Sequence, residues 1–177
     1  LGSSVGVSKV TTEEELTKAV ADAFQYDMKI LIEAALVGRE VECAVLGGRT
    51  PQASGIGEIV PKEGTFYSYE AKYIDADGAQ LIIPAVLPED TVSEIQRMAI
   101  VTFQTLECSG LGRVDFFVTN NGVFVNEINT FPGFTSISMY PKLWEENGIG
   151  YADLLHRLIA LGRQRFQETK ALKKNAI

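Results

Sequence analysis

Two carboxylates are expected to face each other across a β-hairpin in the C-terminal half of the chain. Two hydrophobic runs flank Asn120-Asn121-Gly122, a sequence typical of a tight turn between antiparallel strands. If a three-residue loop closes this hairpin, Thr119 pairs with Val123, and Asp115 then lies opposite Glu127. Like charges directly opposite each other destabilise a sheet, so this acid pair requires a nearby cation.

The same register offers two ways to satisfy the acid pair. Asp115, Glu127 and the neighbouring Asn129 carry hard oxygen ligands, which suit Mg2+ or Mn2+ rather than zinc. Alternatively Arg113, which lies opposite Asn129, neutralises the pair in a structural cluster, or the register slips by one residue. The spacing alone leaves these alternatives open.

The elements that must position the hairpin define a mixed α+β class with an antiparallel sheet packed with helices. A capping box, Thr12-x-x-Glu15, predicts a helix from about Thr12. Hydrophobic patterning predicts strands over 29–33, 40–47, 81–84, 113–119 and 123–129, and helices over 89–107, 141–146 and 151–166. The strand over 40–47 alternates strictly and is expected to be half-buried. From Gly55 to Asp77 no period is visible, and the aromatic content indicates a functional loop rather than disorder.

Composition excludes some classes of partner. Among 177 residues, 16 Lys+Arg against 23 Asp+Glu give a net charge of -7, which argues against nucleic acid as the main partner. No apolar run approaches the ~20 residues needed to span a bilayer, so no membrane association is expected. Cys43 and Cys108 are too few for a disulfide framework, which favours a reduced, cytoplasmic setting. The chain begins with Leu1 and a Gly/Ser-rich turn, so we expect a fragment that lacks an N-terminal portion.

Five short motifs are distributed along nearly the whole chain. They are Gly2-Ser3-Ser4-Val5-Gly6, Gly64-Thr65-Phe66-Tyr67, Glu70-Ala71-Lys72-Tyr73, Gly112-Arg113-Val114-Asp115, and the run from Val125 to Thr135. Together they resemble the D-alanine–D-alanine ligases, a family of ATP-grasp carboxylate–amine ligases. The resemblance implies the C-terminal portion of an ATP-grasp fold. Residues 1–53 would complete the central nucleotide-binding lobe, and residues 54–177 would form the C-terminal catalytic lobe with a lid loop at about 60–77.

The activity implied by this resemblance is the ATP-dependent ligation of two D-alanines to D-alanyl-D-alanine, through an acyl phosphate, for peptidoglycan precursor synthesis. The family uses ATP and two Mg2+ or Mn2+ ions. It implies a cytoplasmic enzyme that is a homodimer when full length, and a fragment that is inactive without its N-terminal half. Two alternatives remain: a ligase for another acceptor, D-lactate or D-serine, and a non-catalytic nucleotide-binding fragment. The lid motif Glu70-Ala71-Lys72-Tyr73 favours the plain D-alanine form.

The resemblance also implies roles at the reaction centre. Asp115, Glu127 and Asn129 match the family's metal ligands, with Glu127 bridging both ions. Arg113 and the backbone N–H of Gly133 match the donors to the oxyanion of the tetrahedral intermediate. Two further matches, Ser138 and the N–H of Met139, hold the carboxylate of the second D-alanine.

For the nucleotide, the resemblance assigns Glu33 to the adenine amino group and the backbone of Leu36 to the adenine ring. It assigns Glu40 to the ribose and Phe66 to packing near the base. Taken alone, Glu33 could equally be a solvent-facing charge at a strand edge.

The lid is assigned in the same way. Lys72 matches a cation that reaches over the γ-phosphate, and Ser4 lies in the loop that covers this phosphate. Tyr73 and Ser3 match a hydrogen-bonded pair that closes the lid. Without the resemblance, these residues would be taken as a solvated lysine, a pinned surface loop and a Gly/Ser linker.

Overall fold

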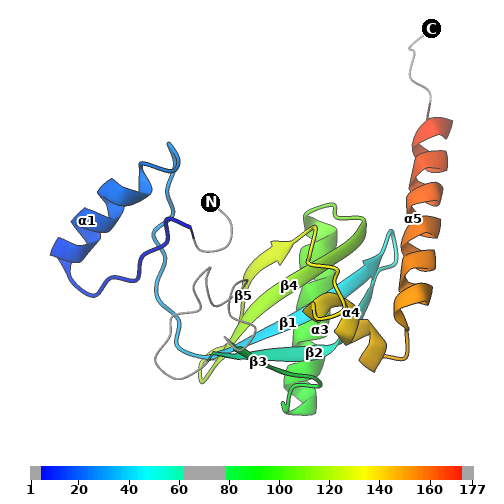
Figure 1. The fold of residues 1–177 in the computed structure, drawn as a ribbon, viewed down its shortest axis with the longest axis horizontal. Coiled ribbons are helices and arrows are strands. Elements are labelled where there is room, and N and C mark those ends of the chain that lie inside the picture. The colour runs from blue at the N-terminus through cyan, green and yellow to red at the C-terminus, as the bar shows by residue number, and fades with distance from the viewer. Residues whose placement is uncertain (1–4, 62–78, 173–177) are drawn as a thin grey trace, which may run out of the picture. The chain divides into compact units, whose positions relative to one another are not determined.

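A computed structural model of the chain describes residues 5–61 and 79–172 (Figure 1). The described residues fall into two compact units, one from Leu1–Val37 and Val60–Gln80 and the other from Gly38–Ile59 and Leu81–Ile177. The boundary expected after residue 53 falls inside a strand of the second unit. That expectation concerns the lobes of a larger enzyme, and it stays a prediction.

The first unit contains helix α1, Glu13–Ala23, and its predicted start is confirmed. The N–H of Glu15 donates to Thr12 Oγ1 at 3.2 Å, and the N–H of Thr12 donates to Glu15 Oε2 at 3.3 Å, which completes the capping box. A hydrogen bond from the backbone of Thr11 is the main reason that the pKa of Glu15 is lowered.

The strand predicted over residues 29–33 of this unit is wrong. The segment is irregular, and the side chains of Leu31 and Ile32 are exposed. A strand requires a hydrogen-bonded neighbour, and no strand in the described part of the chain pairs with this segment.

The second unit is built on a five-stranded sheet with the order β3-β2-β1-β4-β5, shown in Figure 1. The strands are β1 Arg39–Gly47, β2 Gln52–Pro61, β3 Ala79–Ile82, β4 Gly110–Thr119 and β5 Gly122–Asn129. The pairs β1–β2, β1–β4 and β4–β5 are antiparallel, which confirms the predicted antiparallel sheet and the predicted hairpin of β4 and β5.

Strand β2 lies partly in the stretch predicted to be irregular from Gly55, and that prediction is wrong there. Ser54, Gly55 and Gly57 are weak strand formers and hide the alternation. The sheet uses them: Ser54 Oγ accepts the N–H of Ala44 at 2.9 Å, next to a register shift in β1. At Gly57 a Cβ atom would lie 2.5 Å from the Met139 sulfur, so helix α4 approaches the strand closely there.

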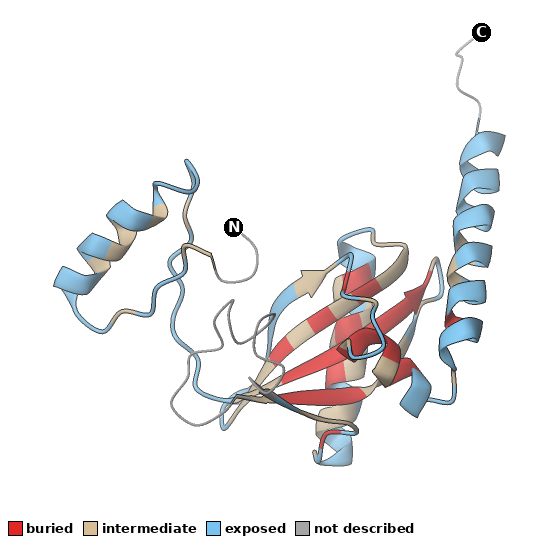
Figure 2. Cartoon of the chain, viewed as in Figure 1, coloured by how far each residue is buried: buried red, intermediate tan, exposed pale blue. Residues whose placement is uncertain are grey.

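Helices cover both faces of the sheet (Figures 1 and 2). Helix α3, Glu89–Thr105, packs on one face, and helix α4, Met139–Glu146, lies on the other, where Tyr140 donates its hydroxyl to Val45 O at 3.0 Å. Helix α5, Tyr151–Ala171, follows α4 and buries only Leu154. The helices predicted at 89–107, 141–146 and 151–166 are therefore confirmed, and α5 is longer than predicted. The core between α3 and the sheet consists of Val41, Cys43, Val45, Ile56, Ala85, Ile95, Ala99, Phe103, Val114 and Phe116.

Strand β1 is buried on both faces, so the prediction of a half-buried strand is wrong. Glu42 and Ala44, on the face expected to meet solvent, are only 5% and 0% exposed. The reason is that the central strand of a sheet with helices on both faces has no solvent side. Among the described residues, no helix is long and apolar enough to cross a membrane.

Candidate active site on the face of β1, β4 and β5

The hairpin of β4 and β5 places Asp115 opposite Glu127 and Arg113 opposite Asn129, as predicted. The loop itself differs from the prediction, because Thr119 pairs with Gly122 and not with Val123. A shift of register between Asp115 and Phe116 compensates for the shorter loop and restores the predicted pairing further along.

The side chain of Thr119 explains the shorter loop. Its hydroxyl accepts the N–H of Asn121 at 3.0 Å and donates to the carbonyl of Gly122 at 3.1 Å. These two bonds fix a tight connection of two residues. Gly122 has a φ of 125°, a backbone conformation that favours glycine.

The acid pair is part of a row of three carboxylates. Asp115 lies opposite Glu127 on β5 and also opposite Glu42 on β1. Burial decreases along the row: the side chain of Glu42 is 6% exposed, that of Asp115 is 16% exposed, and Glu127 is exposed. Sequence reasoning did not single out Glu42, although the alternation of β1 had placed it beside Glu40 on the face away from the apolar residues.

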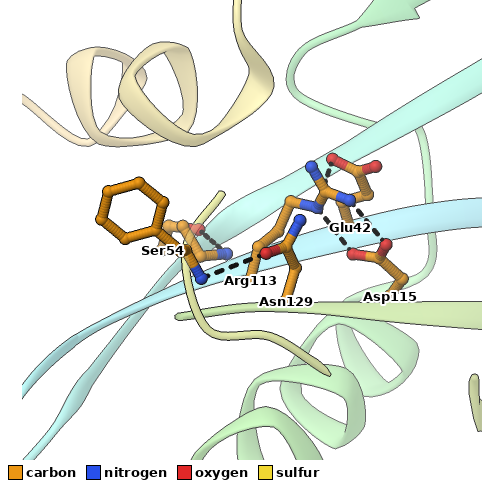
Figure 3. Close-up of polar contacts among 7 residues, drawn as sticks. Glu42, Ser54, Arg113, Asp115 and Asn129 are labelled. Carbon is orange, nitrogen blue, oxygen red and sulfur yellow. Dashed lines mark hydrogen bonds and ion pairs between the residues drawn. The ribbon is translucent and has the colours of Figure 1, made fainter. Parts of the chain in front are cut away.

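Arg113 supplies the cation that this row requires (Figure 3). Its Nε and Nη2 donate to the two carboxylate oxygens of Asp115, both at 2.7 Å, and its Nε lies 3.1 Å from Glu42 Oε2. Burial by itself would lower the pKa of the guanidinium. The hydrogen bonds to Asp115 and the charges of Glu42, Asp115 and Glu127 outweigh burial and raise it, so Arg113 is a permanent positive charge.

The oxygen ligands that remain fit a magnesium-type site. Glu127 makes no ion pair within the described part of the chain, and Asn129 uses Oδ1 to accept the N–H of Phe131 at 3.1 Å. Three carboxylates surround the single guanidinium of Arg113, which leaves an excess of negative charge. The residues described contain no group of three or more His, Cys, Asp or Glu able to hold a metal ion by themselves. Mg2+ usually takes one or two carboxylates together with substrate phosphates, so two acids and an amide suffice.

A loop before α4 brings together two more of the predicted residues. Ser138 occupies the N-cap position of α4 without a side-chain capping bond, and its Oγ instead accepts the N–H of Thr135 at 3.1 Å and lies 2.9 Å from Thr135 Oγ1. A Cβ atom on Gly133 would come within 3.0 Å of the same Ser138 Oγ. Met139 is the first residue of α4, so its N–H belongs to the helix terminus, where backbone donors attract carboxylates.

The residues assigned to the nucleotide fall in both units of the described chain. Glu33 and Leu36 lie in the exposed segment of the first unit, and Glu40 lies on β1, opposite Phe117, on the face of the carboxylate row. The remaining assigned residues fall outside the described residues, as does nearly all of the expected lid loop; they are Ser3, Ser4, Phe66, Lys72 and Tyr73.

The antiparallel sheet lies between helices and carries an acid row and a half-buried arginine on one face, and its fold is that of the C-terminal portion of an ATP-grasp ligase. The family model for the D-ala D-ala ligase C-terminus matches residues 1–160. The chain belongs to this family.

Named relatives agree with the family. A D-alanine–D-alanine ligase from Shouchella clausii is 59% identical over 98% of this chain and 47% of its own length. The solved D-alanine-D-alanine ligase of Coxiella burnetii has a TM-score of 0.84 and 47% identity over 96% of this chain and 44% of that chain. The D-alanine–D-alanine ligase of Bacillus anthracis complexed with ATP has a TM-score of 0.78 and 30% identity, over 94% of this chain and 53% of that chain.

A relative with a different acceptor is also similar. The D-Ala:D-Ser ligase of Enterococcus faecalis has a TM-score of 0.80 and 37% identity, over 90% of this chain and 46% of that chain. This chain spans about half the length of the curated relatives it matches.

Proposed function

We propose that this chain is the C-terminal catalytic part of an ATP-dependent ligase that joins two D-alanines into D-alanyl-D-alanine. The observation that carries the proposal is the acid row, in which Arg113 is held between Glu42 and Asp115, and Asp115 lies opposite Glu127. Phosphoryl transfer needs charge neutralisation and alignment more than covalent help from the protein, and this face would offer both once its carboxylates hold divalent cations. The family membership and the names of the relatives support the choice of substrate.

In this proposal Asp115, Glu127 and Asn129 hold two Mg2+ or Mn2+ ions. Bound there, the ions would neutralise the phosphate oxygens of ATP. Glu127 is suited to this role because its exposed carboxylate is available to ligands, and because Arg113 leaves it without an ion pair among the described residues.

Arg113 and the loop before α4 act on the amino acids. The carboxylate of the first D-alanine attacks the γ-phosphate, ADP leaves, and the amine of the second D-alanine then displaces phosphate from the acyl phosphate. Arg113, charged at any working pH, donates to the oxyanion that forms in the second step, and the N–H of Gly133 donates beside it. Ser138 and the N–H of Met139 hold the carboxylate of the second D-alanine.

The nucleotide and lid assignments belong to the same proposal. Glu33, Leu36, Glu40 and Phe66 would contact adenosine, while Lys72, Ser4 and the pair Tyr73–Ser3 would close over the phosphates. A cytoplasmic, homodimeric full-length enzyme completes the proposal. This chain alone would have no ligase activity.

The decisive experiment compares two glutamates in the full-length protein. Glu127→Gln should remove nearly all D-alanine-dependent ADP release, because half the negative charge of the acid pair Asp115 and Glu127 is lost. The variant should preserve the circular dichroism spectrum. Glu94→Gln on the exposed surface of α3 is the matched control and should leave activity unchanged. Near-normal ADP release by Glu127→Gln would show that the metal assignment is wrong.

The acceptor is tested with the wild-type protein. D-alanine, D-serine and D-lactate are offered as second substrates, and D-alanyl-D-alanine is the expected main product. A mixed dipeptide or a depsipeptide as main product would mean that the acceptor is D-serine or D-lactate, and the proposed ligase reaction would otherwise stand. ATP binding without ADP release for any acceptor would instead indicate a nucleotide-binding module.

A further inference from the structure

Glu42 is a buried carboxylate that the proposed chemistry does not use. Its side chain is 6% exposed, less than that of any other member of the acid row. Acidic side chains are rarely buried to this degree unless they are paired. Its Oε2 lies 3.1 Å from Arg113 Nε, and in the sheet it is the direct neighbour of Asp115 (Figure 3).

Asp115 has two competing tasks in the proposed function. Both of its carboxylate oxygens accept hydrogen bonds from Arg113 at 2.7 Å, and the same carboxylate is expected to bind a divalent cation. A cation bound to Asp115 competes with Arg113 for the carboxylate oxygens, and it therefore weakens the hydrogen bonds between Asp115 and Arg113. A guanidinium with little exposure that loses its partner is strongly destabilised, so cation binding would carry that penalty.

The arrangement of the three side chains offers a way around this conflict. Arg113 Nε donates a hydrogen bond to Asp115 at 2.7 Å and forms an ion pair with Glu42 Oε2 at 3.1 Å, where the angle does not make a hydrogen bond. The residue directly opposite Arg113 on β1 is Ala44, which has no side chain beyond Cβ to separate Arg113 from Glu42. A small rotation therefore moves the guanidinium from one carboxylate to the other without exposing its charge.

We propose that Glu42 is a positioning residue that keeps Arg113 paired when a divalent cation binds Asp115. Glu42 thereby lowers the penalty of cation binding and keeps Arg113 in place to meet the oxyanion. This inference rests on the proposed function, since it requires the cation at Asp115, and it adds a residue that acts only through Arg113.

The test measures cation affinity apart from turnover. Mn2+ is titrated into the full-length protein with a non-hydrolysable ATP analogue, and free Mn2+ is followed by electron paramagnetic resonance. Glu42→Gln keeps the shape of the side chain and removes its charge, and it should raise the Kd for Mn2+ about tenfold, a coupling usual for residues in direct contact. Glu94→Gln is the control for loss of one negative charge and should leave the Kd unchanged. An unchanged Kd in Glu42→Gln would overturn the proposal.

A double-mutant cycle separates this role from a direct attraction between Glu42 and the cation. In the Arg113→Met background no guanidinium competes for Asp115, so adding Glu42→Gln should change the Kd by less than about twofold. A tenfold effect that persists in this background would mean that Glu42 acts on the cation directly, and would overturn the proposal. If Glu42→Gln does not fold, Glu42→Asp replaces it in the cycle, with a smaller rise of the Kd expected because the charge remains.

The same preparations distinguish this inference from the proposed function. Wild-type protein without D-alanine-dependent ADP release defeats the proposed function. Wild-type protein with normal ADP release, and with a Kd that does not respond to Glu42→Gln, defeats only the role of Glu42. In an active enzyme, the positioning role further predicts that Glu42→Gln lowers kcat at saturating Mg2+, because Arg113 is no longer held.

Discussion

Gly133 lies so close to Ser138 that a Cβ atom added to the glycine would come within 3.0 Å of the serine Oγ. Ser138 cannot simply move away, because Thr135 holds the same oxygen through its backbone N–H at 3.1 Å and its hydroxyl at 2.9 Å. A side chain at position 133 therefore displaces the group proposed to hold the acceptor carboxylate.

This contact predicts a specific effect of Gly133→Ala in the full-length protein. The KM for D-alanine as acceptor should rise about tenfold or more, because misplacement of a binding group by a fraction of an ångström is enough to weaken orientation. The KM for ATP should change much less. Gly150→Ala is the matched control, since a Cβ atom there meets nothing within 4 Å, and it should leave both constants unchanged. Equal changes in both constants for Gly133→Ala would argue against an acceptor-side role.

Asn129 leads to a second prediction. Asn129→Ala removes a neutral oxygen ligand, so the Mg2+ concentration for half-maximal ADP release should rise, but activity should recover at high Mg2+, unlike that of Glu127→Gln. Asn121→Ala, at the opposite end of β5 in the exposed hairpin loop, is the control and should leave the Mg2+ dependence unchanged. The measurement is ADP release over a Mg2+ titration. An identical titration for wild type and Asn129→Ala would remove Asn129 from the proposed ligand set.

The pairing of Asp115 with Glu127 could be predicted from the sequence, but the path of the chain that produces it could not. The prediction combined a three-residue loop with an unbroken register, whereas the structure combines a two-residue loop with a register shift beside Asp115. The two differences cancel at the acid pair. Hydrogen bonds of Thr119 select the shorter loop, and a period-two pattern contains no information about such bonds.

Glu42 could not be recognised because its importance depends on pairing between distant strands. Its neighbour Asp115 is more than seventy positions away, and only the antiparallel pairing of β1 with β4 brings them together. Burial on both faces of β1 was missed for the same reason, since the helix that covers the second face follows in the last quarter of the chain. Local patterns predicted α1, α3, α4 and α5 well because helix signals lie within the segment itself.

A stability prediction concerns the ion pair of Arg39 with Glu58 on the α3 side of the sheet. Arg39 Nε and Nη2 donate to the two oxygens of Glu58, both at 2.6 Å, and this hydrogen bonding raises the pKa of Arg39. Glu58→Gln should lower the free energy of unfolding by about 1–2 kcal/mol, less than for a fully buried pair because the Arg39 side chain is 41% exposed. Glu14→Gln breaks the solvent-exposed pair with Lys18 and should have no measurable effect in urea unfolding. Equal midpoints for the two variants would contradict the prediction.

Cys43 and Tyr140 predict a loss of stability at alkaline pH. Burial raises the pKa of the Cys43 thiol from 9.0 to about 12, although hydrogen bonds with Ser54 oppose the rise. Burial likewise raises the pKa of the Tyr140 phenol, opposed by Trp144. Both groups keep their protons in the folded chain at a pH where the unfolded chain has already released them.

The sign of the effect follows from this difference. Below pH 9 both groups are protonated in either state, and their contribution to stability is complete; above it the unfolded state binds fewer protons, so stability falls as pH rises. Between pH 9 and pH 12 the Cys43 thiol should lower the free energy of unfolding by on the order of 1 kcal/mol per pH unit, measured by urea unfolding of the full-length protein with circular dichroism. Cys43→Ala should be less stable at pH 8 because it leaves a small cavity, yet its stability should decline less steeply above pH 9. Tyr140→Phe should flatten the decline only above pH 10, where a free phenol ionises. Identical slopes in wild type and Cys43→Ala would show that the thiol takes no part in the alkaline transition.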